Sequence, residues 1–548
     1  MIALDQPVTP QDAVPVSVPT ALTAAEAHAA RRAADAAALP RLAPPRVERR
    51  ARRAPHGRAV PAPGPARRAI VHLTAEYHGY ARTGGLAEAV AGLAASQARS
   101  GERVFVFVPL YACVRDAAAH LVPITEAHLI EVGGRTEPVR FYRDAARGAG
   151  PTVIFVDAPG CFDRPGLYGD DRGDYPDNHL RFALFARAAL HGIATLVPKP
   201  LLLHAHDWHA ALAPVYMRAH PDVAPHFAGT PTVLSVHNAG YQGHFGASVM
   251  ADLALPPELW HMDRLEWYGR LNLLKGGLVF CDAAVTVSPA HAAELRTAEG
   301  GFGLHETFRG LGDRLVGICN GIEQLQWDPA TDDQIAANYS AIDLSGKAAC
   351  KAALQRAFAL PRRAAIPVIG MSSRLAGQKG FDLLLRSVRL RRPDTQLVII
   401  GEGEARIRDA VAALAAAHPD RVACCFTFTD RLEHQLMAGA DMVLMPSLYE
   451  PCGLTQMHAL RYGAPVIGRR VGGIGDTVVD GDTGILFETF DVEALDTALD
   501  RAMALYADHA AWHAMMRRAM RRDFGWDHSM HHYAEVYGAA ERAVPTEG

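Results

Sequence analysis

The sequence lacks several features that would place the protein in a membrane or a secretory pathway. No apolar run approaches the roughly 20 residues of a membrane-spanning helix. The first residues show no charged start followed by an apolar segment, as a secretory signal would. The 8 cysteines are scattered without a CxxC pair, so neither a disulfide framework nor a zinc knuckle is expected. We therefore expect a cytoplasmic protein.

The chain also has little excess of either charge, and few of its cations are lysine. A net charge of −4, with 21% charged and 49% hydrophobic residues, is that of an ordinary globular protein. It gives no overall attraction to nucleic acid or to anionic membranes, so neither is expected as a partner. Nearly every cation is arginine, so we expect a lysine kept in such a chain to serve as a compact ammonium group. The five lysines are Lys199, Lys275, Lys347, Lys351 and Lys379.

Composition divides the chain into parts. A length of 548 residues is too great for one hydrophobic core. Residues 1–68 are rich in Ala, Pro and Arg and poor in large apolar residues, which predicts a disordered tail. An arginine-rich arm for an acidic partner is the open alternative for this tail.

From Ala69 onward, short β-branched runs alternate with helical patterns, and the alternation resumes after about residue 320. Such alternation is typical of parallel βαβ units. We predict an α/β protein with two Rossmann-like, doubly wound domains, at residues 69–320 and 321–525, facing across a cleft. Their ligands should bind beyond the carboxyl ends of the strands. The predicted strands cover 69–75, 103–109, 152–157, 200–205, 232–237, 283–288, 366–371, 396–401, 421–426 and 441–446.

Glycine-bearing turns follow several of these strands. In 81-ARTGGLAEAV-90, Gly84 and Gly85 open a helix whose first N–H groups would be free for a ligand. Glycine turns also occur in 374-RLAGQKG-380, 446-PSLYEPCGLTQMHAL-460 and 471-VGGIGDTV-478. The cations Arg374 and Lys379 suit a diphosphate, although a solvated turn is the plain alternative. The three turns of the second domain together predict a cradle for one extended anionic ligand.

Two stretches suggest a metal, but we predict none. In 204-HAHDWH-209 the aspartate is one position early for an HxHxDH zinc site. Asp480 and Asp482 resemble a DxD metal motif, but aspartates around a glycine are usually a turn. A further candidate, 235-SVHNAGYQG-243, places His237 and Asn238 at the end of a strand.

Taken together, these motifs resemble bacterial glycogen synthases and plant starch synthases, which are retaining glucosyltransferases of the GT-B fold that use ADP-glucose. The resemblance runs in order from about residue 69 to 530. It is carried by 81-ARTGGLAEAV-90, 204-HAHDWHAAL-212, 235-SVHNAGYQG-243, 272-NLLKGGLVFCDAAVTVSP-289, 315-LVGICNGIEQLQWDPATD-332, 373-SRLAGQKG-380, 449-YEPCGLTQM-457 and 472-GGIGDTV-478.

The resemblance implies roles for the site residues. Arg374 and Lys379 would bind the diphosphate, and Glu450 would face the donor glucose. Asp207, His237 and Asn238 would approach the reacting sugar from the other domain. The sugar nucleotide would also be bound by Arg82, Gly84, Gly85, Phe428 (stacked on adenine), Cys452, Gly453, Leu454 and Thr455. Residues 526–548 are expected to form a helix that returns to the N-terminal domain.

Two positions depart from the family pattern. Arg82 stands where the family usually has a lysine, which leaves the choice between ADP- and UDP-glucose open. His458 stands where related retaining transferases have a second glutamate, a residue that starch synthases also tend to lack.

The resemblance implies a hexosyltransferase that moves glucose from ADP-glucose to the non-reducing 4-hydroxyl of an α-1,4-glucan, with retention and without a cofactor. Another GT-B enzyme, such as a phosphorylase with pyridoxal phosphate or a maltose-1-phosphate-forming transferase, is an alternative. A catalytically silent glucan-binding scaffold is another. Oligomeric state, acceptor length and regulation are not indicated by the sequence.

Overall fold

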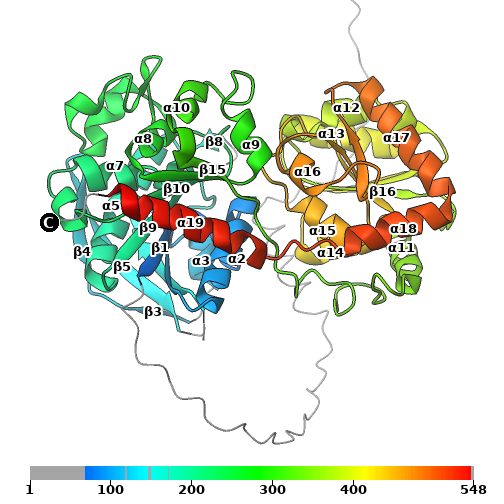
Figure 1. Ribbon diagram of the computed structural model, residues 1–548, viewed down its shortest axis with the longest axis horizontal. Coiled ribbons are helices and arrows are strands. Elements are labelled where there is room, and N and C mark those ends of the chain that lie inside the picture. Colours follow the sequence, from blue (N-terminus) through cyan, green and yellow to red (C-terminus); the bar gives the residue numbers. More distant parts are fainter. Residues whose placement is uncertain (1–67, 118–119, 146–147, 149, 171, 545–548) are drawn as a thin grey trace, which may run out of the picture. The chain divides into compact units, whose positions relative to one another are not determined.

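The computed structural model describes residues 68–544 except 118–119, 146–147, 149 and 171 (Figure 1). The predicted tail therefore lies almost entirely outside the described residues. The described residues all belong to one compact unit. Within the described part, no helix is long and apolar enough to cross a bilayer.

The N-terminal half is built on a large, mostly parallel sheet with strand order β15-β14-β10-β9-β1-β2-β6-β5-β3, and β4 pairs with β5. Its strands from β15 to β6 are parallel, whereas β5 runs antiparallel to β6, β3 and β4. The strands are β1 (Ala69–Leu73), β2 (Arg103–Pro109), β3 (Leu121–Pro123), β4 (His128–Val132), β5 (Arg135–Asp144), β6 (Thr152–Asp157), β9 (Leu201–His206), β10 (Thr232–Val236), β14 (Ala283–Thr286) and β15 (Leu315–Gly317).

The C-terminal half has a smaller, wholly parallel sheet with strand order β18-β17-β16-β19-β20-β21. Every strand in it is short and apolar, as expected for a parallel sheet covered on both faces. The strands are β16 (Val368–Ser372), β17 (Gln396–Ile400), β18 (Val422–Cys425), β19 (Met442–Met445), β20 (Val466–Arg469) and β21 (Gly484–Phe487).

Helices cover both sheets (Figure 1). Those of the N-terminal half are α2 (Gly85–Arg99), α3 (Ala112–Ala117), α4 (Pro159–Phe162), α5 (Asn178–Leu196), α6 (Asp207–Ala210), α7 (Leu212–Ala219), α8 (Leu273–Phe280), α9 (Pro289–Glu294) and α10 (His305–Gly310). Those of the C-terminal half are α11 (Ser345–Ala357), α12 (Phe381–Arg386), α13 (Ala405–Ala417), α14 (Asp430–Gly439), α15 (Thr455–Arg461), α16 (Gly472–Thr477), α17 (Val492–Ala507) and α18 (His509–Met520).

The last helix, α19 (Asp527–Ala543), packs on the N-terminal sheet beside α2 (Figure 1, red). Tyr533, Val536 and Tyr537 of α19 join a buried cluster with Ile70 of β1 and Leu93 of α2. The chain therefore crosses back after α18, and residues about 470 positions apart share one core.

The predicted fold class is confirmed: both halves are doubly wound α/β layers. Each predicted strand is present, with its ends shifted by at most a few residues. Several strands escaped the sequence analysis, namely β3, β4 and β5, the last two strands β20 and β21, the edge strand β15, and the small antiparallel strands β11 (His244–Gly246), β12 (Glu266–Trp267) and β13 (Arg270–Asn272).

Candidate active site

Lys379 and Glu450 form an ion pair at the carboxyl edge of the C-terminal sheet. Lys379 follows β16 and Glu450 follows its neighbour β19. The Lys379 Nζ atom lies 2.6 Å from Oε2 of Glu450, and the Ser447 hydroxyl donates to the same oxygen at 3.0 Å. Glu450 is 5% exposed. No described residue donates to its Oε1 atom, which leaves one carboxylate oxygen and further ammonium protons available to a ligand.

The two loops that carry this pair are bonded to each other. The Leu448 amide donates to the Gln378 carbonyl at 2.8 Å, and the Gln378 side chain donates to the Tyr449 carbonyl at 3.1 Å. Gly380 has a φ of 76° and sits so close to the Pro446 carbonyl that a Cβ would lie 2.0 Å from its oxygen. A side chain at position 380 would therefore push the loops apart.

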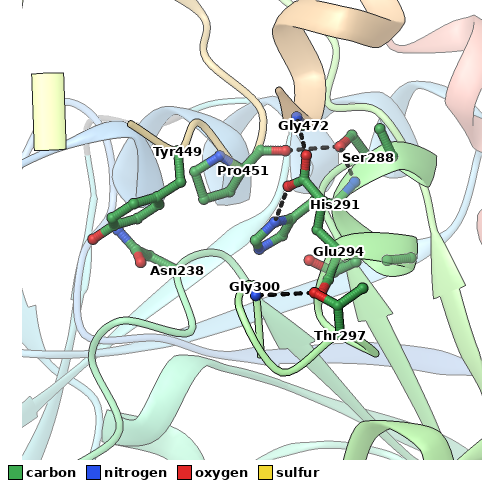
Figure 2. A network of polar contacts seen from close by, with 12 residues as sticks. Asn238, Ser288, His291, Glu294, Thr297, Gly300, Tyr449, Pro451 and Gly472 are labelled. Carbon is green, nitrogen blue, oxygen red and sulfur yellow. Dashed lines mark hydrogen bonds and ion pairs between the residues drawn. The ribbon is translucent and has the colours of Figure 1, made fainter. Parts of the chain in front are cut away.

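Arg374 reaches the opposite domain. Its Nη1 atom lies 3.3 Å from the hydroxyl of Tyr241, and its guanidinium lies 5.9 Å from the centre of that ring. Tyr241 belongs to the loop after β10, and its side chain is half exposed. Asn238 of the same loop lies against the hydroxyl of Tyr449 (Figure 2). Contacts of the loop after β10 with Arg374 and Tyr449 therefore bring Asn238 close to the Lys379–Glu450 pair.

Asp207 holds the backbone that presents His237 and Asn238. Its Oδ1 atom accepts the His237 amide at 2.7 Å and the Asn238 amide at 3.5 Å. Burial raises the pKa of Asp207 to about 7. The two amide hydrogen bonds lower this pKa in part, and repulsion from Glu76 raises it slightly. The residue has a φ of 54°, a strained conformation for a non-glycine residue. The structure thus places Asp207 behind the His237–Asn238 turn, as its buried support.

The 81–85 loop is held by a buried carboxylate just before α2. The amides of Thr83 and Gly84 both donate to Oε2 of Glu76, at 2.7 and 3.3 Å, and the Thr83 hydroxyl donates to Oε1. Glu76 is 3% exposed and also accepts the Tyr168 hydroxyl. These two amides precede α2, so Glu76 braces the loop, whereas the amides of Gly85 and Leu86 at the start of the helix donate to no described residue. Gly84 and Gly85 themselves remain exposed, with open space around Gly84.

Arg82 joins the two domains beside that loop. Its guanidinium pairs with Glu88 at 3.3 Å and, more closely, with Asp430 of α14. It also lies 5.4 Å from the ring centre of Phe428. The Phe428 amide is anchored on Glu402, at 2.9 Å from Oε1. The Phe428 ring, which is expected to stack on adenine, is thus partly covered by Arg82. The two side chains together form the surface available to the base.

The turn from Cys452 to Thr455 starts α15. The Cys452 side chain is buried in the core of the C-terminal half, and burial raises the pKa of its thiol well above the usual value. Its side chain is therefore directed away from any ligand. Gly453 takes a φ of 70°, and neither its amide nor that of Leu454 donates to another described residue. Those two amides, with the Thr455 hydroxyl, are the ligand-binding groups that this turn offers.

The fourth glycine turn contacts the N-terminal half (Figure 2). The Gly472 amide donates to Oε1 of Glu294 at 2.7 Å, and the Ser288 hydroxyl donates to the Pro451 carbonyl at 2.8 Å. The other oxygen of Glu294 lies 3.4 Å from Nδ1 of His291. The glycine pattern of this turn predicts that it lines the anion cradle. That expectation was wrong for the Gly472 amide, which is already paired with Glu294.

His458 lies behind the site. Its imidazole stacks on Trp327 with ring centres 3.6 Å apart, and it approaches Glu433 at 3.7 Å. Trp327 stacks on His434 with its other face, at 4.0 Å. A cavity of about 200 Å³ lies here, and its lining includes Glu88, Asp430, Leu454, Trp327 and His458 but neither Arg374 nor Glu450. This cavity is thus separate from the Lys379–Glu450 pair.

Comparisons with known proteins decide the family. The starch synthase catalytic domain matches residues 69–310, and the group 1 glycosyl transferases match residues 357–519. A glycogen synthase from Thioalkalivibrio sulfidiphilus is 40% identical over 484 residues, covering 85% of this chain and 99% of that protein. The chain belongs to the glycogen synthase family.

Other relatives agree. Glycogen synthase 2 from Geobacter sulfurreducens is 40% identical over 478 residues, covering 86% of this chain and 98% of that protein. The structure of the catalytic domain of starch synthase IV from Arabidopsis thaliana, bound to ADP and acarbose, is 31% identical. It superimposes with a TM-score of 0.79 over 87% of this chain and 100% of that one. The resemblance drawn from the sequence motifs is confirmed, and the chain is a glycosyltransferase of the glycogen and starch synthase type.

Sequence reasoning missed three residues that organise the site. Glu76 and Glu294 each accept backbone amides of a glycine turn, and Tyr241 contacts Arg374. Tyr241 lies within a motif that was singled out, 235-SVHNAGYQG-243, and could have been found there. Glu76 gave a weaker signal, a carboxylate just after a buried strand, and Glu294 gave none.

Proposed function

We propose that the chain transfers glucose from ADP-glucose to the non-reducing 4-hydroxyl of an α-1,4-glucan, with retention of configuration. The observation that carries this proposal is the Lys379–Glu450 pair at 2.6 Å, on the same edge as Arg374. It joins a phosphate-binding cation to a carboxylate that has one unoccupied oxygen. The starch synthase with a matching fold binds ADP and acarbose, a nucleotide and an oligosaccharide mimic, which supports a nucleotide sugar and a glucan as the substrates.

In this proposal the cations act on the leaving group. As the bond from the anomeric carbon to the phosphate oxygen breaks, negative charge collects on ADP and positive charge on the sugar. Arg374 and Lys379 neutralise the diphosphate, together with the amides of Gly453 and Leu454 and the Thr455 hydroxyl. Because a lysine ammonium has three donors, Lys379 can keep Glu450 and bind phosphate at once. No metal or cofactor is proposed, because these groups already supply the required positive charge.

The remaining groups act on the sugar and the base. Glu450 stabilises the positive charge on the glucosyl ring, with His237 and Asn238 on the other side, held by Asp207. The acceptor hydroxyl attacks the face from which ADP departs, and its proton passes to a phosphate oxygen of ADP. Phe428 and Arg82 bind the adenine, and the loop at Gly84 and Gly85 lets the substrate approach the backbone. We propose a cytoplasmic location, as expected for a nucleotide-sugar substrate.

A product assay tests the reaction. The chain is incubated with labelled ADP-glucose and glycogen, and in parallel with labelled UDP-glucose. We expect label from ADP-glucose in glycogen, released as maltose by β-amylase, which cuts α-1,4 bonds. Labelled maltose 1-phosphate would identify a different retaining transferase, and glycogen binding without transfer would identify a scaffold. Activity that persists in EDTA is expected, and its loss would contradict the metal-free proposal.

A further inference from the structure

Three histidines point from one face of the N-terminal sheet toward two helices. His72 of β1 pairs in register with His204 of β9, and His206 pairs with Ser235 of β10. Residues two apart on a strand share a face, so His204 and His206 lie on the same side. The helices α2 and α19 cover this face and contribute Gln97 and Tyr537. All of these side chains are buried.

These side chains form one continuous chain of hydrogen bonds that ends at His237. Nε2 of His237 lies 3.0 Å from Nδ1 of His206, and Nε2 of His206 lies 2.9 Å from Nδ1 of His72. Nε2 of His72 lies 2.7 Å from Oε1 of Gln97. His237 is half-buried at the end of β10, and no described residue bonds to its Nδ1 atom. Nδ1 is therefore the ring nitrogen left for a substrate.

A second branch leaves the other end of the same amide. Nε2 of Gln97 donates to the Tyr537 hydroxyl at 2.8 Å, and that hydroxyl lies 2.9 Å from Nδ1 of His204. Nε2 of His204 lies 2.7 Å from the Ser235 hydroxyl. The helix α19 thus bonds directly to the amide that ends the His72 branch.

Burial keeps the histidines neutral. Loss of hydration lowers the pKa of His72 to about 4 and that of His237 to about 3, and it lowers the pKa values of His204 and His206 well below the usual range. A neutral imidazole has one donor nitrogen and one acceptor nitrogen. In a row of such rings the direction of one hydrogen bond therefore fixes the direction of all the others.

The same three histidines are a candidate metal site, since one ring nitrogen of each lies within 4.8 Å of one nitrogen of each of the other two. However, each of the six ring nitrogens of His72, His204 and His206 already has a hydrogen-bond partner. A metal would have to displace several of these bonds in a closed core. The arrangement favours a hydrogen-bonded relay over a metal site.

We infer that Gln97 fixes the tautomer of the site histidine His237, and that the hydrogen bond to Tyr537 holds the Gln97 side chain in place. With Oε1 of Gln97 facing His72, the proton of His72 is on Nε2. His206 then donates from Nε2, and His237 donates from Nε2 to His206. Nδ1 of His237 is left as an acceptor for a hydroxyl group of the donor sugar. This last step rests on the proposed function.

The reverse order requires only that one amide turn over. His237 would then carry its proton on Nδ1 and would offer a donor to the sugar hydroxyl in place of an acceptor. Gln97 and Tyr537 are positioning residues, because they act on the substrate only through His237.

Nitrogen-15 NMR of histidine-labelled protein tests the tautomer directly, because protonated and unprotonated ring nitrogens have well-separated shifts. The His237 signals are identified by their loss in His237→Asn. We expect a protonated Nε2 and an unprotonated Nδ1 in the unaltered chain. Gln97→Glu, which has acceptors at both ends, should keep this pattern, whereas Gln97→Leu should give a mixed or reversed one.

Kinetics give the second readout. Gln97→Leu should lower kcat by about three- to tenfold, the worth of one neutral hydrogen bond, with unchanged ADP affinity. Gln97→Glu should restore most of that loss. Gln355→Leu is the matched control, since Gln355 is likewise buried, at 2% exposure, and is bonded to another side chain, Gln396. It should change neither kcat nor the His237 signals. If Gln97→Leu does not fold, Tyr537→Phe removes only a hydroxyl and should also mix the tautomers.

A protonated Nδ1 in the unaltered chain would overturn the inference, as would His237 signals that stay the same in both Gln97→Leu and Tyr537→Phe. One bound zinc per chain, lost in His72→Asn, would also overturn it. The expected tautomer in a chain that transfers no glucose would refute the proposed function and leave the relay standing. Glucose transfer by a chain whose His237 has the other tautomer would refute the relay and leave the proposed function standing.

Discussion

The ammonium of Lys379 lies 2.6 Å from the carboxylate of Glu450, and both side chains are largely buried. Seventy-one positions separate the two residues in the chain, yet β16 and β19 are neighbours in the sheet. Lys379, which we propose binds the diphosphate, is thus already paired with Glu450, which we propose faces the sugar. Substitution of either residue therefore leaves the other without its partner, and the two roles must be separated by their kinetic effects.

Lys379→Ala should reduce transfer strongly. A hydrogen bond to a charged group is worth about 1.5–3 kcal/mol, which corresponds to a rate loss on the order of tenfold to a few hundredfold. Steady-state kinetics with ADP-glucose measure this loss. Lys199→Ala is the control, because Lys199 is exposed and donates to the His226 carbonyl far from the site. An unchanged kcat and KM in Lys379→Ala would remove Lys379 from the active site.

Glu450→Gln should lower kcat by at least about tenfold while ADP still binds. The amide can accept hydrogen bonds from Lys379 and Ser447, so the loop keeps its shape, but the negative charge facing the sugar is lost. Single-turnover transfer and calorimetry with ADP are measured on the same protein. Near-normal transfer would refute the role on the sugar. Loss of both transfer and ADP binding would show that Glu450 only braces the loop.

Much of the fold was predictable from the sequence because parallel strands are short apolar runs. The runs at β1, β9 and β16 stand out against polar helical patterns. By contrast, β4 and β5 alternate buried and exposed residues, since they lie in the antiparallel part of the sheet. Alternation of this kind gives a weaker signal than a continuous apolar run.

The residues of the site were predictable from the sequence, but their hydrogen-bond and ion-pair partners were not. Strand order places Arg374, Lys379 and Glu450 on one edge, so their gathering follows from the fold. That Glu76 would occupy the Thr83 and Gly84 amides depends on side-chain reach between loops, which no spacing encodes. The HxH spacing of His204 and His206 puts both side chains on one face of β9. The partner Tyr537, more than 300 positions away, is what makes that face a hydrogen-bonded relay.

Arg82→Ala should weaken ADP binding by about tenfold, since it removes a guanidinium group from the Phe428 ring and from Asp430. Arg82→Lys keeps the charge and should bind ADP within about threefold of the unaltered chain. Calorimetry with ADP and with UDP measures both affinities. If Arg82→Ala binds ADP normally, the guanidinium contributes only a surface ion pair.

A chain shortened to residues 64–548 should keep its melting temperature and its transfer rate, because it contains all of the described residues, which belong to one compact unit. Arg68, which pairs with Glu541 on α19, is retained in it. A chain that begins at residue 71 loses this pair and the first two residues of β1, and it should melt at a lower temperature. A large fall in melting temperature for the 64–548 chain would mean that the tail stabilises the body.

Asp207→Asn should remove a pH dependence near neutrality. Burial raises the pKa of Asp207 to about 7, so the carboxyl is protonated below that pH and ionised above it. The ionised form should favour the positively charged transition state, so kcat/KM should rise between about pH 6 and 8. His237 and His72, with pKa values of about 3 and 4, do not titrate in this range.

The stability of the fold should change with pH in the opposite direction. Because the pKa of Asp207 is higher in the folded chain than in the unfolded chain, protonation stabilises the fold. This stabilisation is complete below the unfolded pKa and is lost as the pH rises through about 7. In Asp207→Asn, which cannot ionise, both the rise in kcat/KM and this part of the stability profile should be absent. A kcat/KM profile of Asp207→Asn that still rises near pH 7 would assign the ionisation to another group.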